Sequence, residues 1–357
     1  MSNKAMVLIF SSLRFFLIVC SMESLYSLPD NLPRAWNEIN IGGATTCARG
    51  EDFSFFVYPG RTNKVVIDFM GGGACWNAET CSEDGATFID SIEFIRERQR
   101  NGEEGVYNRN NPDNPLKDWY HVIVPYCTGD IHWGSNSVNY QLDSGESFSI
   151  QHYGAINSQA VLDWVADNFE SPGDVLMTGC SAGAYGSIYW APHYKELFPE
   201  ANFYHLADSG AGIVTDNFFR NSFPNWQASR FAADWVPGLD PEINDWFDLT
   251  LDHMYLSVAG YYDHSSFSQF NMKKDEIQKF FYEIMGGDSS HWEKKLNISM
   301  KKLTQSLDNF KTYTYPGNDH CILPYNYLYE LNHEGVSFLD WFKRYISGES
   351  VSNIGLR

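Results

Sequence analysis

The sequence predicts an α/β fold with a doubly wound, mainly parallel sheet. Three observations lead to this prediction: short apolar runs typical of buried strands alternate with helical periodicity, the runs end in loops rich in glycine or polar residues, and one run leads directly into a Gly-x-Ser-x-Gly pentapeptide. In sheets of this kind, the functional loops lie at the carboxyl ends of the strands. The chain has 357 residues, 43% of them hydrophobic, which is enough for one large domain over residues 28–357.

The predicted elements follow one another along the chain. Apolar runs predict strands at 65–70, 122–126, 174–178, 203–207, 254–258 and 311–315. Apolar residues at helical spacing predict a helix over 154–169 and a closing amphipathic helix over 338–345. The aromatic-rich segment 215–250 is predicted to be a helical insertion that lies over the sheet and covers the active site.

Residues 1–27 resemble a secretory signal sequence, with cleavage between residues 21 and 27. Lys4 precedes two apolar runs, and small residues follow them, although Arg14 interrupts the apolar region. A membrane anchor fits less well, because no uninterrupted apolar run approaches the roughly 20 residues that span a bilayer. A lipoprotein site at Cys20 also fits less well, because Val19 is bulky where such sites need a small residue. We therefore expect a secreted or periplasmic protein without stable membrane insertion.

The net charge argues against a nucleic-acid partner, and the cysteines favour disulfides over a zinc site. The formal net charge of −20 argues against nucleic acid, because phosphate binding requires concentrated Lys and Arg. Once the leader is removed, six cysteines remain, and an even number in an exported protein favours disulfides. No Cys-x-x-Cys pair occurs, so a zinc site is not expected. We predict no metal and no organic cofactor.

The pentapeptide Gly179-Cys-Ser181-Ala-Gly183 provides the candidate nucleophile. It follows the predicted strand at 174–178, and a helix start rich in small residues, Ala182-Gly-Ala184-Tyr-Gly186, comes after it. In α/β-hydrolases this pentapeptide forms a sharp turn from strand to helix that holds the serine Oγ exposed above the sheet. An ordinary glycine-rich turn is the alternative, but the strand before it and the helix after it favour the catalytic interpretation. We therefore predict an α/β-hydrolase-like fold with Ser181 as nucleophile.

Gly71-Gly72-Gly73-Ala74 provides candidate donors for an oxyanion hole. The run ends a predicted strand upstream of the nucleophile, and its backbone N–H groups are not shielded by side chains. In α/β-hydrolases, the residue after the nucleophile, here Ala182, usually donates a second N–H. A flexible glycine turn is the alternative. We predict an oxyanion hole formed by Gly72, Gly73, Ala74 and Ala182.

Four motifs, at 71–76, 124–130 with 132–134, 179–183 and 207–210, occur in order along the chain. Together they resemble the pectin acetylesterase family, which also contains the Notum carboxylesterase. The resemblance runs from about Cys47 to His320. It implies a secreted α/β-hydrolase-like esterase with a Ser-Asp-His triad, which acts on O-acyl groups carried by glycans or, in Notum, by a lipidated protein.

Two positions depart from the family pattern. Plant and animal members tend to place Trp directly after the three glycines, whereas this chain has Ala74, with Trp76 two positions later. Ala184 stands where many members have glycine. The first difference would reshape the acyl pocket, for which Trp76, Trp133 and Asp208 are the candidate residues, so the resemblance does not identify the substrate.

His320 is the candidate base. In α/β-hydrolases the acid follows the serine and the histidine follows the acid. His320 comes after the last predicted strand and also matches the family by resemblance. His333 is the only later histidine, and no strand precedes it, so we expect it to be a surface or helix-capping residue.

Asp263 is the candidate acid. It follows the predicted strand at 254–258 and matches, through Gln269, the family's pattern of an aspartate followed by a glutamine. Asp208 also follows a predicted strand and is the rival, although the resemblance suggests that it shapes the pocket. Asp319 adjoins His320 and would point elsewhere.

The six cysteines are predicted to form three bridges. Cys75 and Cys81 bracket the loop after the glycines, and the resemblance implies a bridge from Cys47 to Cys127. Cys180 and Cys321 are neighbours of Ser181 and His320, which must meet, so these two cysteines are predicted to lie within bridging distance. The alternative is that Cys180 is a buried free thiol.

We therefore predict a secreted serine carboxylesterase that removes O-acyl groups, with O-acetyl groups of a polysaccharide as the expected substrate. One alternative is a longer acyl chain on a protein or lipid. A second is an inactive carbohydrate-binding relative, because the 16% aromatic content would also suit sugar stacking. A metal hydrolase using Asp130, His132, Asp263 and His264 is disfavoured, since their spacing matches no ligand motif.

Overall fold

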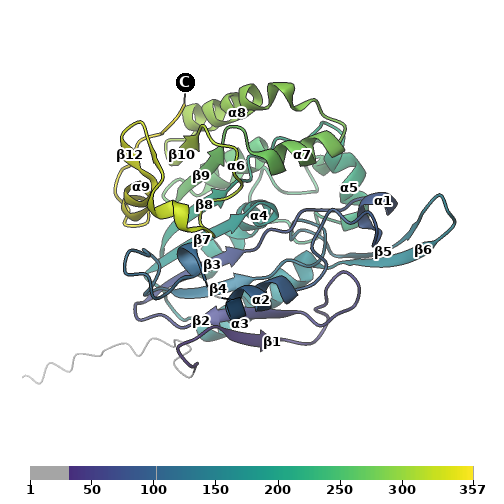
Figure 1. Ribbon diagram of the computed structural model, residues 1–357, viewed down its shortest axis with the longest axis horizontal. Coiled ribbons are helices and arrows are strands. Elements are labelled where there is room, and N and C mark those ends of the chain that lie inside the picture. The colour runs from purple at the N-terminus through teal and green to yellow at the C-terminus, as the bar shows by residue number, and fades with distance from the viewer. Residues whose placement is uncertain (1–31, 102, 357) are drawn as a thin grey trace, which may run out of the picture.

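An eight-stranded sheet forms the centre of the computed structural model, which describes residues 32–101 and 103–356 (Figure 1). In spatial order the strands are β1 (Asn37–Asn40), β2 (Ser54–Tyr58), β4 (Tyr120–Val124), β3 (Lys64–Phe69), β7 (Asp174–Cys180), β8 (Asn202–Asp208), β9 (Ser266–Met272) and β10 (Phe310–Tyr315). All neighbouring strands from β4 to β10 are parallel, whereas β2 is antiparallel to both β1 and β4. The predicted fold class is confirmed. The predicted signal sequence lies outside the described residues.

Helices flank the sheet (Figure 1). They are α1 (Ala78–Cys81), α2 (Glu93–Asn101), α3 (Gly154–Asn168), α4 (Ala182–Leu197), α5 (Phe218–Trp226), α6 (Leu251–Tyr261), α7 (Glu276–Ile284), α8 (Trp292–Ser306) and α9 (Phe338–Tyr345), with short 3₁₀ turns η1 (Gly105–Tyr107), η2 (Trp246–Asp248), η3 (Ser289–His291) and η4 (Asn326–Tyr329). Two small antiparallel pairs lie outside the sheet, β5 (Asn136–Gln141) with β6 (Ser147–His152) and β11 (Asn332–His333) with β12 (Val336–Ser337). Within the described chain, no helix has both the length and the apolar character needed to cross a membrane.

The predicted strand at 254–258 is wrong, because these residues belong to α6. Thr250 caps the helix by accepting the N–H of His253. One face of the helix is buried, and it consists of Leu251, Met254, Tyr255, Val258 and Ala259. The strand of this region is β9, which the apolar pattern did not reveal. Ser268, Gln269 and Asn271 of β9 are fully buried, so its sequence lacks the apolar run typical of a central strand.

The segment 215–250 is less helical than predicted. It contains α5 and η2, and turns connect them. Trp226 and Trp246 are buried, whereas Trp235 stays 38% exposed. Only Phe218 of this segment lines the pocket that contains Ser181, so the cover over the active site is smaller than predicted.

The structure contains the three predicted disulfides, Cys47–Cys127, Cys75–Cys81 and Cys180–Cys321. They differ in the length of chain that they close, with sequence separations of 80, 6 and 141 residues, respectively. In the chain-entropy description, a cross-link that closes a longer loop restricts the unfolded chain more strongly.

Replacing both cysteines of one bridge should therefore destabilise the protein according to loop length. Cys47→Ala with Cys127→Ala should lower the free energy of unfolding by about 2–5 kcal/mol, and Cys75→Ala with Cys81→Ala by roughly half as much. Urea denaturation of both double variants beside the wild type measures the difference. An equal or larger loss for the Cys75 and Cys81 pair would contradict the prediction.

Candidate active site

Ser181 occupies the predicted sharp turn between β7 and α4. Its backbone has φ 57° and ψ −121°, a conformation that an L-residue adopts only under constraint. The turn is tight because α4 lies directly on the sheet: a Cβ at Gly183 would be 1.8 Å from the carbonyl oxygen of Phe69. The Ser181 N–H donates to the backbone oxygen of Asp208 at 2.8 Å. Gly183 is therefore required by packing. The turn leaves Ser181 at the carboxyl edge of the sheet.

His320 pairs with Asp275. The His320 Nδ1 atom lies 3.0 Å and 2.8 Å from the two carboxylate oxygens of Asp275. The Nε2 atom of the same ring is buried and has no hydrogen-bond partner among the described residues. Ser181 and His320 line the same pocket. This arrangement leaves Nε2 available to accept a proton from a nucleophile, while the carboxylate fixes the tautomer that carries hydrogen on Nδ1.

The structure does not bring the predicted acid, Asp263, to His320. Asp263 follows α6 with its side chain 74% exposed, and its nearest ionic neighbour is His264 at 3.7 Å. The error follows from the assignment of 254–258 as a strand, because that assignment placed Asp263 at a strand end. Asp275 comes three residues after β9 and has a fully buried side chain.

Helix α7 holds the Asp275 carboxylate in place. Asp275 is the N-cap residue, and its Oδ1 accepts the N–H groups of Ile277 and Gln278 at 3.0 Å and 2.9 Å. The Gln278 side chain donates to Oδ2 at 2.9 Å, and its Oε1 accepts the N–H of Ala211. The sequence did contain a signal for this position, since an aspartate directly before an amphipathic segment is typical of a helix start.

Two of the four predicted oxyanion donors fit the site best. The Ala74 N–H is already donated to the carbonyl of Thr87 at 3.2 Å, so Ala74 is not an available donor and this part of the prediction is wrong. Gly73 and Ala182 also line the pocket, and their N–H groups have no acceptor among the described residues. Gly73 has φ 78°, which favours glycine. Gly72 does not line this pocket.

Asp208 hydrogen-bonds to the loops that carry Ser181 and His320, and it does not line the pocket. Its carboxylate accepts the N–H groups of Ile322 and Leu323, each at 2.8 Å, two and three residues after His320. The Ser209 Oγ accepts the N–H of Cys321, which has a left-handed φ of 62°. Burial raises the pKa of Asp208 to about 7, an effect that the Ile322 and Leu323 N–H groups partly oppose. The end of β8 therefore positions the loop that carries His320.

Asp130 and His132 are buried, and their hydrogen bonds join neighbouring loops to one another. The Asp130 carboxylate accepts from Thr128 Oγ1 and from the N–H groups of His132 and Gly154. The His132 Nε2 lies 2.8 Å from the carbonyl oxygen of Met70, and burial lowers its pKa to about 4, so the ring is neutral and donates this bond. The four residues of the metal alternative do not meet, because Asp130 and His132 are buried whereas Asp263 and His264 are exposed.

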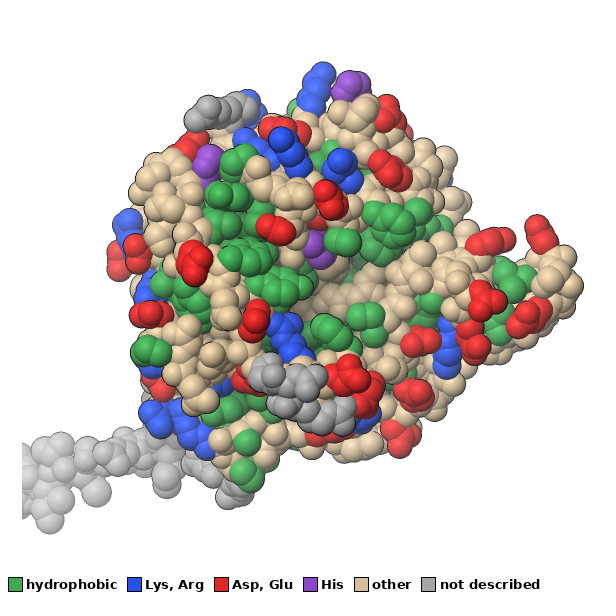
Figure 2. Space-filling model, viewed as in Figure 1, with side chains coloured by type: hydrophobic (Ala, Val, Ile, Leu, Met, Phe, Trp, Pro, Cys, Tyr) green, Lys and Arg blue, Asp and Glu red, His purple; other side chains and the backbone are tan. Residues whose placement is uncertain are grey.

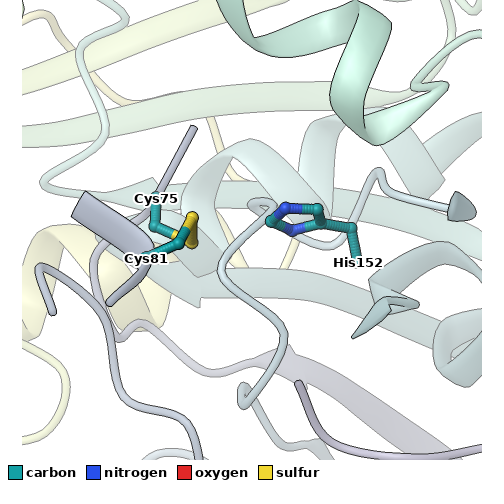
Figure 3. Close-up of side chains that lie close together, drawn as sticks. All are labelled: Cys75, Cys81 and His152. Carbon is teal, nitrogen blue, oxygen red and sulfur yellow. A yellow bond between two sulfur atoms is a disulfide. The ribbon is translucent and has the colours of Figure 1, made fainter. Parts of the chain in front are cut away.

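Cys75, Cys81 and His152 lie close together (Figure 3), with one ligand-type atom from each inside a 4.8 Å cluster. The two sulfur atoms are joined in a disulfide, so neither is a thiolate. The His152 ring nitrogens contact the Thr128 carbonyl at 3.0 Å and the Tyr140 hydroxyl at 2.9 Å. Burial lowers the pKa of His152 to about 4. The cluster is accounted for by a disulfide and a hydrogen-bonded core histidine.

The pocket beside Ser181 has an apolar wall. It encloses about 520 Å³ of space, part of which is open to solvent. Its apolar lining comes from Ala74, Ile131, Ile213, Val214, Phe218, Ile277, Phe281, Met285 and Trp292. No Lys, Arg, Asp or Glu belongs to the lining, and Figure 2 shows hydrophobic side chains around the hollow on this face. The chemistry of this pocket suits the hydrocarbon part of an ester.

Neither predicted pocket tryptophan lines this pocket. Trp133 is fully buried, stacks on Tyr189 and donates its indole N–H to the Tyr185 carbonyl. Trp76 packs edge to face on Phe218 and borders a separate groove. Much of the apolar lining beside Ser181 comes instead from α7 and from residues 213–218, which no motif had indicated.

Comparisons with known proteins agree with this fold. The sequence model of the family described as Pectinacetylesterase matches residues 40–229. Pectin acetylesterase 7 of Arabidopsis thaliana is 26% identical over 175 residues, which are 48% of this chain and 43% of that protein. Pectin acetylesterase 11 of the same plant is 22% identical over 217 residues, which are 58% of this chain and 54% of that protein. The chain thus spans about half the length of these curated relatives. The solved structure of the Wnt deacylase Notum from Drosophila superposes with a TM-score of 0.64 and 16% identity, over 90% of this chain and 96% of that one.

Replacing Asp275 should damage ester hydrolysis far more than replacing Asp263. Asp275→Asn should lower kcat by at least ~10²-fold, because asparagine cannot stabilise an imidazolium or hold its tautomer. Asp263→Asn is the matched control, since its carboxylate is exposed, and it should stay within about twofold of the wild type. Steady-state hydrolysis of a nitrophenyl ester measures both. The reverse order would contradict the geometry.

Asp208→Asn should change how stability depends on pH. Because the pKa of Asp208 is raised, the folded state binds this proton more tightly than the unfolded state, so the contribution of the carboxyl to stability falls as pH rises from the unfolded value of 3.8 towards about 7. Asparagine does not ionise, so the variant should gain stability relative to the wild type across this interval. Urea denaturation between about pH 4.5 and pH 7.5 tests this, with Asp263→Asn as control. A difference that is constant with pH would refute it.

Proposed function

Because the chain belongs to the pectinacetylesterase family, we propose that it is a secreted serine carboxylesterase that removes O-acyl groups from a glycan. The observation that carries this proposal is the pairing of His320 Nδ1 with Asp275, while the buried Nε2 atom has no partner among the described residues and His320 lines the same pocket as Ser181. The family match ends at residue 229, so the roles of Asp275 and His320 rest on geometry.

The proposed mechanism uses the groups of the site in two steps. Ser181 Oγ attacks the ester carbonyl while His320 Nε2 takes its proton, and the N–H groups of Gly73 and Ala182 donate to the oxyanion. His320 then gives the proton to the departing alcohol, which leaves an acyl group on Ser181. Water attacks this acyl-enzyme with His320 again as base, and the products are a carboxylic acid and the free serine. Asp275 orients the imidazole and stabilises its charged form without taking the proton.

The acyl group has two candidates. Membership of the family supports O-acetyl groups of a polysaccharide, as the names of the Arabidopsis relatives suggest. The apolar wall favours a longer chain, because Phe281 and Met285 add hydrocarbon surface to the lining that a single methyl group does not need. Burial of each additional CH₂ is worth about 0.8 kcal/mol, so a pocket of this character should discriminate between chain lengths.

A nitrophenyl ester series tests the activity and the acyl group together. Hydrolysis of the acetate, butyrate and octanoate should be detectable, and kcat/KM should rise by up to ~10-fold from acetate to butyrate as two CH₂ groups enter the pocket. Ser181→Ala should lower each rate by at least ~10³-fold and should abolish labelling by a fluorophosphonate. Unlabelled wild-type protein without turnover would instead indicate an inactive glycan-binding relative.

A pair of substitutions locates the acyl chain. Val214→Phe narrows the pocket and should reduce octanoate hydrolysis more than acetate hydrolysis. Ile298→Phe adds an aromatic ring at a position on α8 that is 57% exposed, so it is the matched control and should change neither rate. A falling kcat/KM from acetate to octanoate in the wild type would support acetyl as the natural group.

A further inference from the structure

A second hollow lies beside the active-site pocket, on the other side of α5. It holds about 800 Å³ of space open to solvent, between the start of α1, strand β5 and helix α5. Five carboxamide side chains line it: Asn77, Asn139, Gln141, Asn221 and Asn225. We call this hollow the amide groove. Its lining contains no Lys, Arg, Asp or Glu.

The amides retain hydrogen-bonding capacity towards a ligand. Asn77 uses its Oδ1 to cap α1, and Asn139 uses its Oδ1 to accept from Ser149, which leaves both NH₂ groups without a partner among the described residues. Gln141 and Asn221 are exposed, and their side chains make no hydrogen bond within the described part of the chain. An amide both donates and accepts, as a sugar hydroxyl does.

Two aromatic residues belong to the lining of the amide groove. Trp76 and Tyr140 both line it, and each is only 7% exposed, so the rings are fixed by the core and present a small apolar area. A pyranose ring has an apolar C–H face and a rim of hydroxyl groups. Apolar ring surface with neutral amides around it therefore matches the surface of a saccharide.

The walls of the amide groove are held together before any ligand binds. Asn225 Nδ2 donates to the Trp76 carbonyl at 2.9 Å, and Asn136 Nδ2 donates to the Asn225 carbonyl at 2.9 Å. Trp226 Nε1 donates to the Cys75 carbonyl at 3.0 Å, and Cys75 is bridged to Cys81. These bonds join α5 to β5 and to the loop before α1. Binding therefore requires little ordering of the walls.

The electrostatics of this region select against an anionic chain. The protein carries a net charge of −20, and Asp143 and Glu146 lie in the turn of the β5–β6 hairpin that forms one wall. Figure 1 shows this hairpin projecting beside α1 and α5, and Figure 2 shows acidic side chains on the projection. A uronic acid polymer would meet these carboxylates without a cation in the lining to pair with.

The amide groove is connected to the active site through a thin wall. Phe218 of α5 lines the Ser181 pocket and contacts Trp76 of the amide groove, with ring centroids 5.0 Å apart. On the neighbouring loop, Ala74 lines the pocket and Trp76, two residues later, lines the amide groove. A substrate with its acyl group at Ser181 can thus extend its alcohol part over this wall.

We propose that the amide groove is the subsite for the alcohol part of the substrate and that it takes a neutral saccharide chain rather than a polyuronate. This proposal rests on the proposed esterase function for the position of the acyl group. It also specifies the class of glycan. The family name alone would suggest the acidic backbone of pectin.

Direct binding tests the amide groove without catalysis. Isothermal titration of the Ser181→Ala protein with xylohexaose, cellohexaose, mannohexaose and hexagalacturonate separates neutral from anionic chains of equal length. At least one neutral hexasaccharide should bind, and hexagalacturonate should bind at least ~10-fold more weakly. Adding Asn139→Ala and Asn221→Ala should weaken binding of the neutral chain by ~10-fold or more, because two hydrogen-bonding groups are lost.

Gln305→Ala is the matched control, since it removes an exposed amide from α8. Its affinity should equal that of the parent, and thermal unfolding should show that both sets of variants are folded. The proposal is overturned if no neutral hexasaccharide binds, if hexagalacturonate binds as tightly, or if the double substitution leaves affinity unchanged. If the esterase proposal alone were wrong, the wild-type protein would hydrolyse no nitrophenyl ester. It would still bind the neutral saccharide, and this binding would depend on Asn139 and Asn221.

Discussion

The carboxyl end of β8 holds the two halves of the active site in one geometry. The backbone oxygen of Asp208 accepts the N–H of Ser181, and the carboxylate of the same residue accepts two N–H groups of the loop after His320. The Cys180–Cys321 bridge joins the same two loops covalently. Both loops contain a residue with positive φ, Ser181 and Cys321, and such conformations persist only where the surroundings fix them. The position of His320 relative to Ser181 therefore depends on a buried carboxyl group that does not itself line the pocket.

The sequence was informative where close packing restricts residue choice. Gly183 must be glycine because α4 touches the backbone of β3, and this requirement produced the pentapeptide that identified Ser181. The Cys180–Cys321 bridge was predicted for a similar reason, because residues adjacent to groups that must meet are themselves close, whereas the Cys47–Cys127 pairing came from the family resemblance. The fold class followed from the alternation of strand and helix, which depends on many residues and tolerates single errors.

Sequence reasoning failed where tertiary contacts replace the apolar pattern. The fully buried polar residues of β9 are hydrogen-bonded to neighbours: Ser268 donates to the carbonyl of His205, and Asn271 pairs with Gln269. A central strand with such a sequence cannot be recognised by hydrophobicity, and so Asp275 beyond it was missed. The pocket beside Ser181 was missed because Phe281 on α7 and Met285 at its C-terminal end line it together with Ser181 only through the fold. The Ala74 N–H was misassigned because its bond to Thr87 forms across a loop that no local pattern reveals.

The Cys180–Cys321 bridge has a consequence for the resistance of the site to proteases. Its cysteines are 141 residues apart in sequence, and the intervening chain includes the turn-rich segment between α5 and α6 with exposed residues such as Trp235 and Ile243. Protease cleavage concentrates at such exposed turns. A single cut there would produce two fragments, one carrying Ser181 and the other carrying Asp275 and His320, that stay joined through sulfur. A protein nicked in this way would keep Ser181 and His320 on one covalent molecule, and the sheet between them would still hold them in place.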